Sequence, residues 1–312
     1  MSEMIKTMTQ ERAAATVGRS EIPDGTWPVM LTPFGEDGRV DESAVGPLVS
    51  WYVQRGAAGL FACCSSSEVE TLSWAEKLRL TELTLAEAAG RCAVVGSAMA
   101  LEPGRDLAEA VGQVHGLGVS AVVLNLAELA DAGEDDGVVR ARLEGLLKAT
   151  PGVPLGLYEC PSPYHRLAGP GLLDWASETG RFVFFKDTCC DGGVLRERLD
   201  RLRGSAMRLF NAHTPLMREA LGWGAAGFCG LGTNFYPERY DRLQASVAAG
   251  GDDEAAALQA QLDATDPLIH RRYPRSAKAY VRSQGVAIGT TCRRAVDELR
   301  PEDEAFLAQL GA

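Results

Sequence analysis

Short apolar runs alternate with amphipathic stretches along the chain as far as Pro237. The apolar runs have the length of strands and are bounded by glycine, proline, asparagine or charged residues. We predict strands at Pro28–Thr32, Gly59–Cys63, Cys92–Gly96, Ala121–Asn125, Pro154–Tyr158, Phe182–Lys186, Arg208–Asn211 and Gly227–Gly230. Strands that alternate with helices are typical of βα units around a parallel sheet, and eight such units close a barrel.

The stretches between these runs have the pattern of helices. Val45, Leu48, Val49 and Tyr52 fall on one helical face, and Asp41 is placed to cap that helix. A second helix has a clear start, because Ser73 and Glu76 have the spacing of a capping box before the Trp74–Ala89 stretch.

Beyond Pro237 the strand pattern ends, and the sequence predicts helices at Tyr240–Ala249, Asp253–Thr265 and Ser276–Gly285, with prolines such as Pro267 between them. The predicted fold class is therefore α/β, a (β/α)8 TIM barrel with a small C-terminal helical region. The expected divisions are an N-terminal tail (1–24), a barrel catalytic domain (25–237) and the C-terminal helical region (238–312).

Composition and charge narrow the class of protein. The formal net charge of −11 argues against nucleic acid or an anionic membrane surface as a partner. We expect a cytoplasmic protein, because the first twenty residues lack the apolar core of an export signal and no later stretch is apolar enough to span a bilayer. The eight cysteines are expected to be reduced thiols, and neither they nor the four histidines have the spacing of a metal site. We expect no metal and no organic cofactor.

Candidate chemistry follows from the residues that end the predicted strands, since the βα loops form the mouth of such a barrel. Lys186 ends the apolar run from Phe182, where desolvation would favour its uncharged, nucleophilic form. Tyr158 ends the preceding run, so its hydroxyl and the amine would face one cavity and exchange protons. The alternative interpretations are a lysine paired with Asp187 or extending outward, and a buried tyrosine with a satisfied hydroxyl.

A polar loop follows the second predicted strand. Ser65, Ser66 and Ser67, followed by Glu68, supply hydroxyls and backbone amides that could hold a carboxylate. Taken alone, such a run is an ordinary serine-rich turn.

These features, in this order, resemble the family of dihydrodipicolinate synthase and N-acetylneuraminate lyase, which uses pyruvate or a related 2-oxo acid. The matching segments are Gly25–Phe34, Ser65–Glu68, Tyr158 with Pro161, Lys186–Asp187, and Gly224–Gly227 with Asn234 and Pro237. The resemblance implies that Lys186 forms an imine and that Tyr158 relays protons. It also implies that Ser65 and Ser66 hold the carboxylate and pass a proton, and that the carbonyl of Cys229 orients the substrate. The full expected set is Lys186, Tyr158 and Ser65 as catalytic residues, with Ser66, Ser67, Thr32, Cys229, Glu159, Asn211 and His213 binding substrate.

Several departures from the family pattern fall on residues that choose the second substrate. Asn125–Leu129 stands where the synthases have Pro-Tyr-Tyr, and Pro163 stands where they have an arginine. The segment from Asn211 to Pro215 lacks the acidic residues of the sialic-acid lyases. We therefore expect a divergent member with neither of these two activities. Ser67 and Glu159 also replace a family glycine and asparagine, and a serine would strain the loop if its position required a positive φ.

The sequence thus predicts a class I aldolase or lyase that joins pyruvate or another 2-oxo acid to an aldehyde, or cleaves the product. Two alternatives remain open: a 2-keto-3-deoxy sugar acid dehydratase that uses the same imine, and a catalytically silent barrel that binds a metabolite. The partners expected are small molecules, and a homo-oligomer, either a tetramer or a dimer, is expected from the family.

Overall fold

A computed structural model describes residues 22–310, and its centre is a barrel of parallel strands. The strands are β1 (Gly25–Thr26), β2 (Gly59–Phe61), β3 (Ala93–Ser97), β4 (Ala121–Asn125), β5 (Leu155–Tyr158), β6 (Phe182–Asp187), β7 (Arg208–Asn211) and β8 (Gly227–Phe228). Each strand from β2 to β7 pairs with the next in the chain, and β8 pairs with β1. Parallel bridges from Thr26 to Ala57 and from Val29 to Phe61 join β1 to β2 and close the ring.

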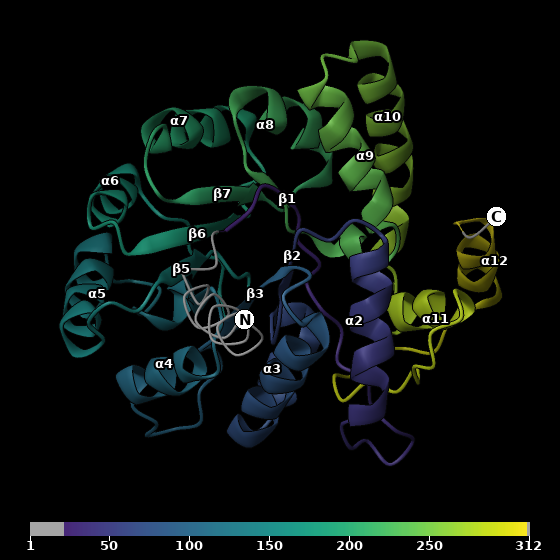
Figure 1. The fold of residues 1–312 in the computed structure, drawn as a ribbon, viewed down its shortest axis with the longest axis horizontal. Coiled ribbons are helices and arrows are strands. Elements are labelled where there is room, and N and C mark those ends of the chain that lie inside the picture. The colour runs from purple at the N-terminus through teal and green to yellow at the C-terminus, as the bar shows by residue number, and fades with distance from the viewer. Residues whose placement is uncertain (1–21, 311–312) are drawn as a thin grey trace, which may run out of the picture.

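Helices surround this ring (Figure 1). Those of the barrel are α2 (Val45–Gln54), α3 (Trp74–Ala88), α4 (Leu107–Gly116), α5 (Asp136–Ala149), α6 (Pro170–Glu178), α7 (Gly192–Leu202), α8 (Met217–Trp223) and α9 (Pro237–Ala248). They are followed by α10 (Asp252–Ile269), α11 (Arg275–Ser283) and α12 (Pro301–Leu310). The (β/α)8 barrel predicted from the sequence is confirmed, together with helices at the C-terminal end of the chain.

Local signals in the sequence account for several element boundaries. The capping box is present at the start of α3, where the Ser73 side chain accepts from Glu76 N and the Glu76 carboxylate accepts from Ser73 N. Asp41 caps a short 3-10 helix before α2, accepting from Ser43 N. These caps satisfy amides that the first helical turn leaves without partners.

Three predictions about elements need correction. The first strand is β1, earlier than the predicted Pro28–Thr32, of which Val29 contributes one bridge. The helix α10 continues through Pro267, whose missing N–H falls in the last turn and costs a single backbone bond. The helix α12 was not predicted. Most of the predicted tail, residues 1–21, lies outside the described residues.

The barrel interior forms a core of its own, separate from the core between the strands and the helices. Aromatic rings fill part of this interior. The centroid of the Phe184 ring lies 5.2 Å from that of Trp27 and 4.8 Å from that of Phe210. Because side chains alternate along a strand, Lys186 points to the same side of β6 as Phe184. The lysine side chain therefore lies next to this aromatic cluster inside the barrel. Within residues 22–310, no helix is both long and apolar enough to cross a membrane.

Candidate active site

The structure places Lys186 and Tyr158 side by side inside the barrel. They are register partners on β6 and β5, and each has only 4% of its surface exposed. Lys186 Nζ lies 4.1 Å from the centroid of the Tyr158 ring and 5.7 Å from that of Phe61. The amine thus meets the face of the phenol, and it donates its hydrogen bond to Cys64 Sγ at 3.4 Å. Neither an ion pair with Asp187 nor an outward orientation describes this lysine.

The groups around Lys186 act on its pKa in opposite directions. Burial lowers it, but electrostatic interactions with Cys64, Cys229 and Cys160 and the hydrogen bond to Cys64 raise it, and the net pKa lies above the ordinary value. Burial itself raises the pKa of Cys229 to about 12 and also raises the pKa of Cys160. These two groups are therefore neutral thiols near pH 7, and the net direction for the Lys186 amine is a raised pKa.

The phenol of Tyr158 is also kept uncharged. Burial raises its pKa well above the ordinary value, and Cys64, Cys160 and Cys229 act in the same direction. Its hydroxyl interacts with the thiol of Cys160, two residues further along the chain. The phenol is thus a neutral group whose ring face, rather than its hydroxyl, meets the amine.

The serine loop forms a 3-10 helix, η2 (Ser65–Ser67), at the carboxyl end of β2. Ser67 Oγ donates to Met30 O at 2.6 Å, and Thr32 Oγ1 donates to Ser67 O at 2.7 Å. The side chains of Thr32 and Ser67 therefore hold the loop to the segment after β1. The hydroxyls of Ser65 and Ser66 take no part in these two hydrogen bonds. Ser67 does not have a positive φ, so a serine at this position does not strain the loop.

The left-handed residue of this loop is Glu68, with φ 58°. Its fully buried carboxylate accepts from Lys278 Nζ at 2.7 Å and from Arg294 N at 2.7 Å. The guanidinium of Arg294 also donates to Ser65 O, and the Tyr273 hydroxyl interacts with Ser66. The C-terminal region therefore fixes the conformation of the serine loop, a contribution that the sequence did not predict.

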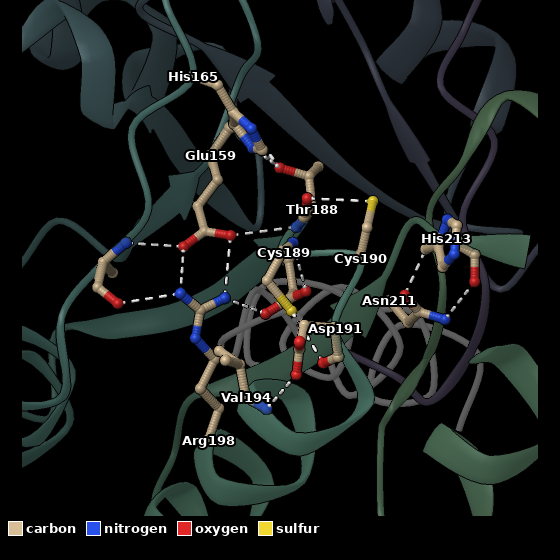
Figure 2. Close-up of polar contacts among 12 residues, drawn as sticks. Glu159, His165, Thr188, Cys189, Cys190, Asp191, Val194, Arg198, Asn211 and His213 are labelled. Atoms are coloured by element: carbon tan, nitrogen blue, oxygen red, sulfur yellow. Dashed lines mark hydrogen bonds and ion pairs between the residues drawn. The ribbon is translucent and has the colours of Figure 1, made fainter. Parts of the chain in front are cut away.

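Glu159 lies on the outer side of the barrel wall. Its carboxylate accepts hydrogen bonds from both terminal nitrogens of Arg198 on α7, at 2.7 and 3.0 Å (Figure 2). It also accepts from the backbone amides of Ala168 and Thr188. Asp187 binds the same guanidinium. Burial and the nearby Asp187 raise the pKa of Glu159 to about 7. Since Tyr158 and Glu159 are adjacent on the chain and point to opposite faces, this carboxylate joins β5 to α7 and does not face Lys186.

The remaining predicted residues lie at the ends of β7 and β8. The Asn211 side chain binds the turn that follows it, donating to His213 O and accepting from His213 N (Figure 2). The half-buried ring of His213 lies near Asp266, whose pKa is lowered against the effect of burial by hydrogen bonds with His270 and Thr214, with His213 contributing least. Cys229 is fully buried and its amide donates to Asn211 O. His165 Nε2 lies 2.8 Å from Oγ1 of Thr188, which follows the neighbouring strand β6.

A cavity of about 610 Å³ adjoins the site on the side of β3 and β4. Ser65 and Cys160 form part of its wall, and its polar lining includes Asn125, Glu128 and Arg105. This volume is in the range of small-molecule sites. In the part of the chain that the structure describes, no cluster of three or more His, Cys, Asp or Glu side chains is arranged to hold a metal ion.

Comparisons with known proteins identify the family and agree with this fold. The model of the "Dihydrodipicolinate synthetase family" matches residues 23–124 and 149–310, and the chain belongs to this family. A 4-hydroxy-tetrahydrodipicolinate synthase of Gluconacetobacter diazotrophicus is 28% identical over 281 residues, which cover 86% of this chain and 89% of the relative. Membership identifies the chain as a class I lyase, an enzyme that acts on small molecules.

Solved structures show the same fold. A putative dihydrodipicolinate synthetase from Pseudomonas aeruginosa aligns with a TM-score of 0.81 at 24% identity, over 92% of this chain and 98% of the other. The dihydrodipicolinate synthase of Acinetobacter baumannii, solved in complex with pyruvate, aligns with a TM-score of 0.80 at 21% identity, over 92% and 97% of the two chains.

Proposed function

We propose that this protein is a lyase that forms a Schiff base between Lys186 and pyruvate or another 2-oxo acid, and that makes or cleaves a carbon–carbon bond to an aldehyde. The observation that carries the proposal is the environment of Nζ. It is buried inside the barrel, beside a neutral phenol and a thiol, with no carboxylate bound to it among residues 22–310. The pyruvate complex of the Acinetobacter baumannii relative supports a 2-oxo acid as the ligand.

In the proposed reaction the Lys186 amine attacks the ketone carbon, water leaves, and an iminium ion forms. The iminium accepts electrons from the neighbouring carbon, which loses a proton or a carbon substituent and becomes an enamine. Tyr158 supplies and removes the protons at the neighbouring carbon. Ser65 and Ser66 hold the substrate carboxylate, and the carbonyl of Cys229 orients it. The aldehyde would occupy the mouth, where the 610 Å³ cavity borders Ser65.

Borohydride trapping tests this proposal. The protein is incubated with pyruvate or a panel of 2-oxo acids, reduced, and weighed intact, and the adduct is mapped by peptide analysis. We expect one adduct, on Lys186, and no adduct in Lys186→Ala. Lys148→Ala is the matched control, because Lys148 is exposed at the end of α5 and its loss leaves the site intact. Failure to trap any 2-oxo acid would leave the silent metabolite-binding barrel as the better description.

Product analysis separates the lyase from the alternative dehydratase. A 2-keto-3-deoxy sugar acid that is cleaved releases pyruvate and an aldehyde, whereas one that is dehydrated keeps its carbon chain and loses 18 mass units of water. Both reactions would give the adduct on Lys186, so the products decide between them.

A further inference from the structure

The thiol of Cys64 is the polar group in direct contact with the reacting amine. Cys64 comes directly after the turn that ends β2, is fully buried, and accepts the hydrogen bond from Lys186 Nζ at 3.4 Å. The Tyr158 hydroxyl is occupied with Cys160, and the ring face of Tyr158 is turned to Nζ. The Cys64 sulfur is therefore hydrogen-bonded to Nζ and is placed to exchange a proton with it directly.

The backbone directs this thiol into the site. Cys63 adopts a left-handed conformation, φ 55°, and its own thiol points outward, 3.5 Å from Lys77 O and 3.8 Å from Thr81 Oγ1 on α3. Cys63 belongs to the core between strands and helices, whereas Cys64 belongs to the core inside the barrel. The two adjacent thiols thus face opposite sides of the wall.

We propose that Cys64 is a catalytic residue that exchanges protons with Lys186 Nζ and with the carbonyl oxygen of the 2-oxo acid during imine formation. This inference rests on the function proposed above and names the group that moves its first protons. The pocket also contains the thiols of Cys160 and Cys229 and the phenol of Tyr158, all of them uncharged near neutral pH.

The step balances in atoms and electrons. The nitrogen lone pair forms the N–C bond, and the C=O π electrons move to oxygen, which takes the thiol proton. The thiolate then takes a proton from nitrogen and becomes a thiol again, which gives a neutral carbinolamine. In the second half the thiol protonates the hydroxyl, the C–O bond breaks, and water leaves. The products are an iminium ion on Lys186 and the Cys64 thiolate beside it. A thiol has an ordinary pKa of about 8.5, closer to neutrality than a phenol, and is suited to both directions of transfer.

The test measures the rate of borohydride trapping with pyruvate in Cys64→Ala and Cys64→Ser. We expect both variants to form the Lys186 adduct slower than the wild type, by a factor on the order of 10² to 10⁴. The pyruvate concentration that gives half the maximal rate should change by less than about threefold, because the sulfur touches the amine and not the carboxylate. Cys63→Ala is the matched control, as it removes the neighbouring thiol from the other face, and it should trap at the wild-type rate.

Each other outcome overturns the inference. If Cys64→Ser traps as fast as the wild type, the position needs only a small polar group, since a hydroxyl ionises far less readily than a thiol. If Cys63→Ala slows trapping as much as Cys64→Ala, the loss reflects packing at the end of β2. Melting curves of the three variants identify a variant that is not folded, and the serine variant, which keeps the shape of the side chain, then decides. If the wild type traps no 2-oxo acid, the proposed function itself fails, whereas trapping at one common rate in all variants removes only the role of Cys64.

Discussion

Glu68 and Lys278, which lie at opposite ends of the chain, form an ion pair 2.7 Å long in which neither side chain has exposed surface. Lys278 Nζ also donates to Thr291 O, and the second oxygen of Glu68 accepts from Arg294 N. The pair connects α11 to the residue that ends the serine loop. In this protein the C-terminal region thereby shapes the serine loop, where the substrate carboxylate is expected to bind.

Replacing Lys278 with Met should destabilise the protein and loosen the serine loop. Removing one partner of a buried pair leaves the other charge without compensation, which costs about 3 to 5 kcal/mol. We expect a lower urea midpoint and a higher KM for the 2-oxo acid. Arg242→Met is the control, because its ion pair with Glu254 is exposed and worth less than about 1 kcal/mol. Equal losses in the two variants would show that burial of the pair has no special effect.

Tyr158→Phe should slow turnover far more than it weakens substrate binding. The ring would keep its contact with Lys186 Nζ, while the proton donor is lost, so kcat should fall by a factor on the order of 10² to 10⁴. The KM should stay within a few-fold, and steady-state kinetics measures both constants. Tyr280→Phe, a buried tyrosine of α11 whose ring packs on Phe235, should leave both unchanged. An equal loss of kcat and of binding in Tyr158→Phe would contradict the proton-relay role.

Thr32→Val should raise the KM for the 2-oxo acid through the serine loop. Valine has nearly the same shape but cannot donate to Ser67 O, so a buried carbonyl loses its partner at a cost of about 1 to 3 kcal/mol. Thr32→Ser keeps the hydroxyl and should behave like the wild type in both stability and KM. A normal KM in Thr32→Val, together with the expected loss of stability, would show that the loop reaches its binding conformation without this bond.

The residues on neighbouring strand ends were predictable from the sequence because parallel strands bring their carboxyl ends together. Tyr158 and Lys186 each close an apolar run, and a shared register follows once the two runs are adjacent. The orientation of the phenol was not predictable: the ring face and not the hydroxyl meets the amine, as packing against Phe61 and Lys186 requires.

Contacts between distant parts of the chain could not be predicted, because no pattern in the neighbouring sequence indicates them. Lys278 occupies an ordinary position in a helical pattern, and only the fold brings it to Glu68. The same holds for Arg198 on α7, which donates to the carboxylates of Glu159 and Asp187 at the barrel wall. Cys64 stood beside the predicted loop, but the direction of its thiol depends on the left-handed conformation of Cys63, which neither composition nor periodicity indicates.

The Glu159 carboxyl should make stability depend on pH in a defined window. Its pKa in the folded protein is raised to about 7 by burial, with a further contribution from Asp187, against an ordinary value of 4.5. A carboxyl with a raised pKa binds more protons in the folded than in the unfolded state. Its contribution to the free energy of unfolding is therefore fully present below pH 4.5 and is lost as the pH rises through about 7. At about 1.36 kcal/mol per pKa unit the loss is on the order of 3 kcal/mol.

Glu159→Gln removes this titration and should flatten the dependence. Urea unfolding of both proteins between pH 4 and pH 8 measures it: the stability of the wild type relative to the variant should fall across the window from about 4.5 to 7. Glu178→Gln, at the exposed end of α6, should follow the wild-type curve at every pH. Parallel curves for wild type and Glu159→Gln would mean that Arg198 keeps Glu159 ionised throughout, and that the extra proton of the cluster lies on another group.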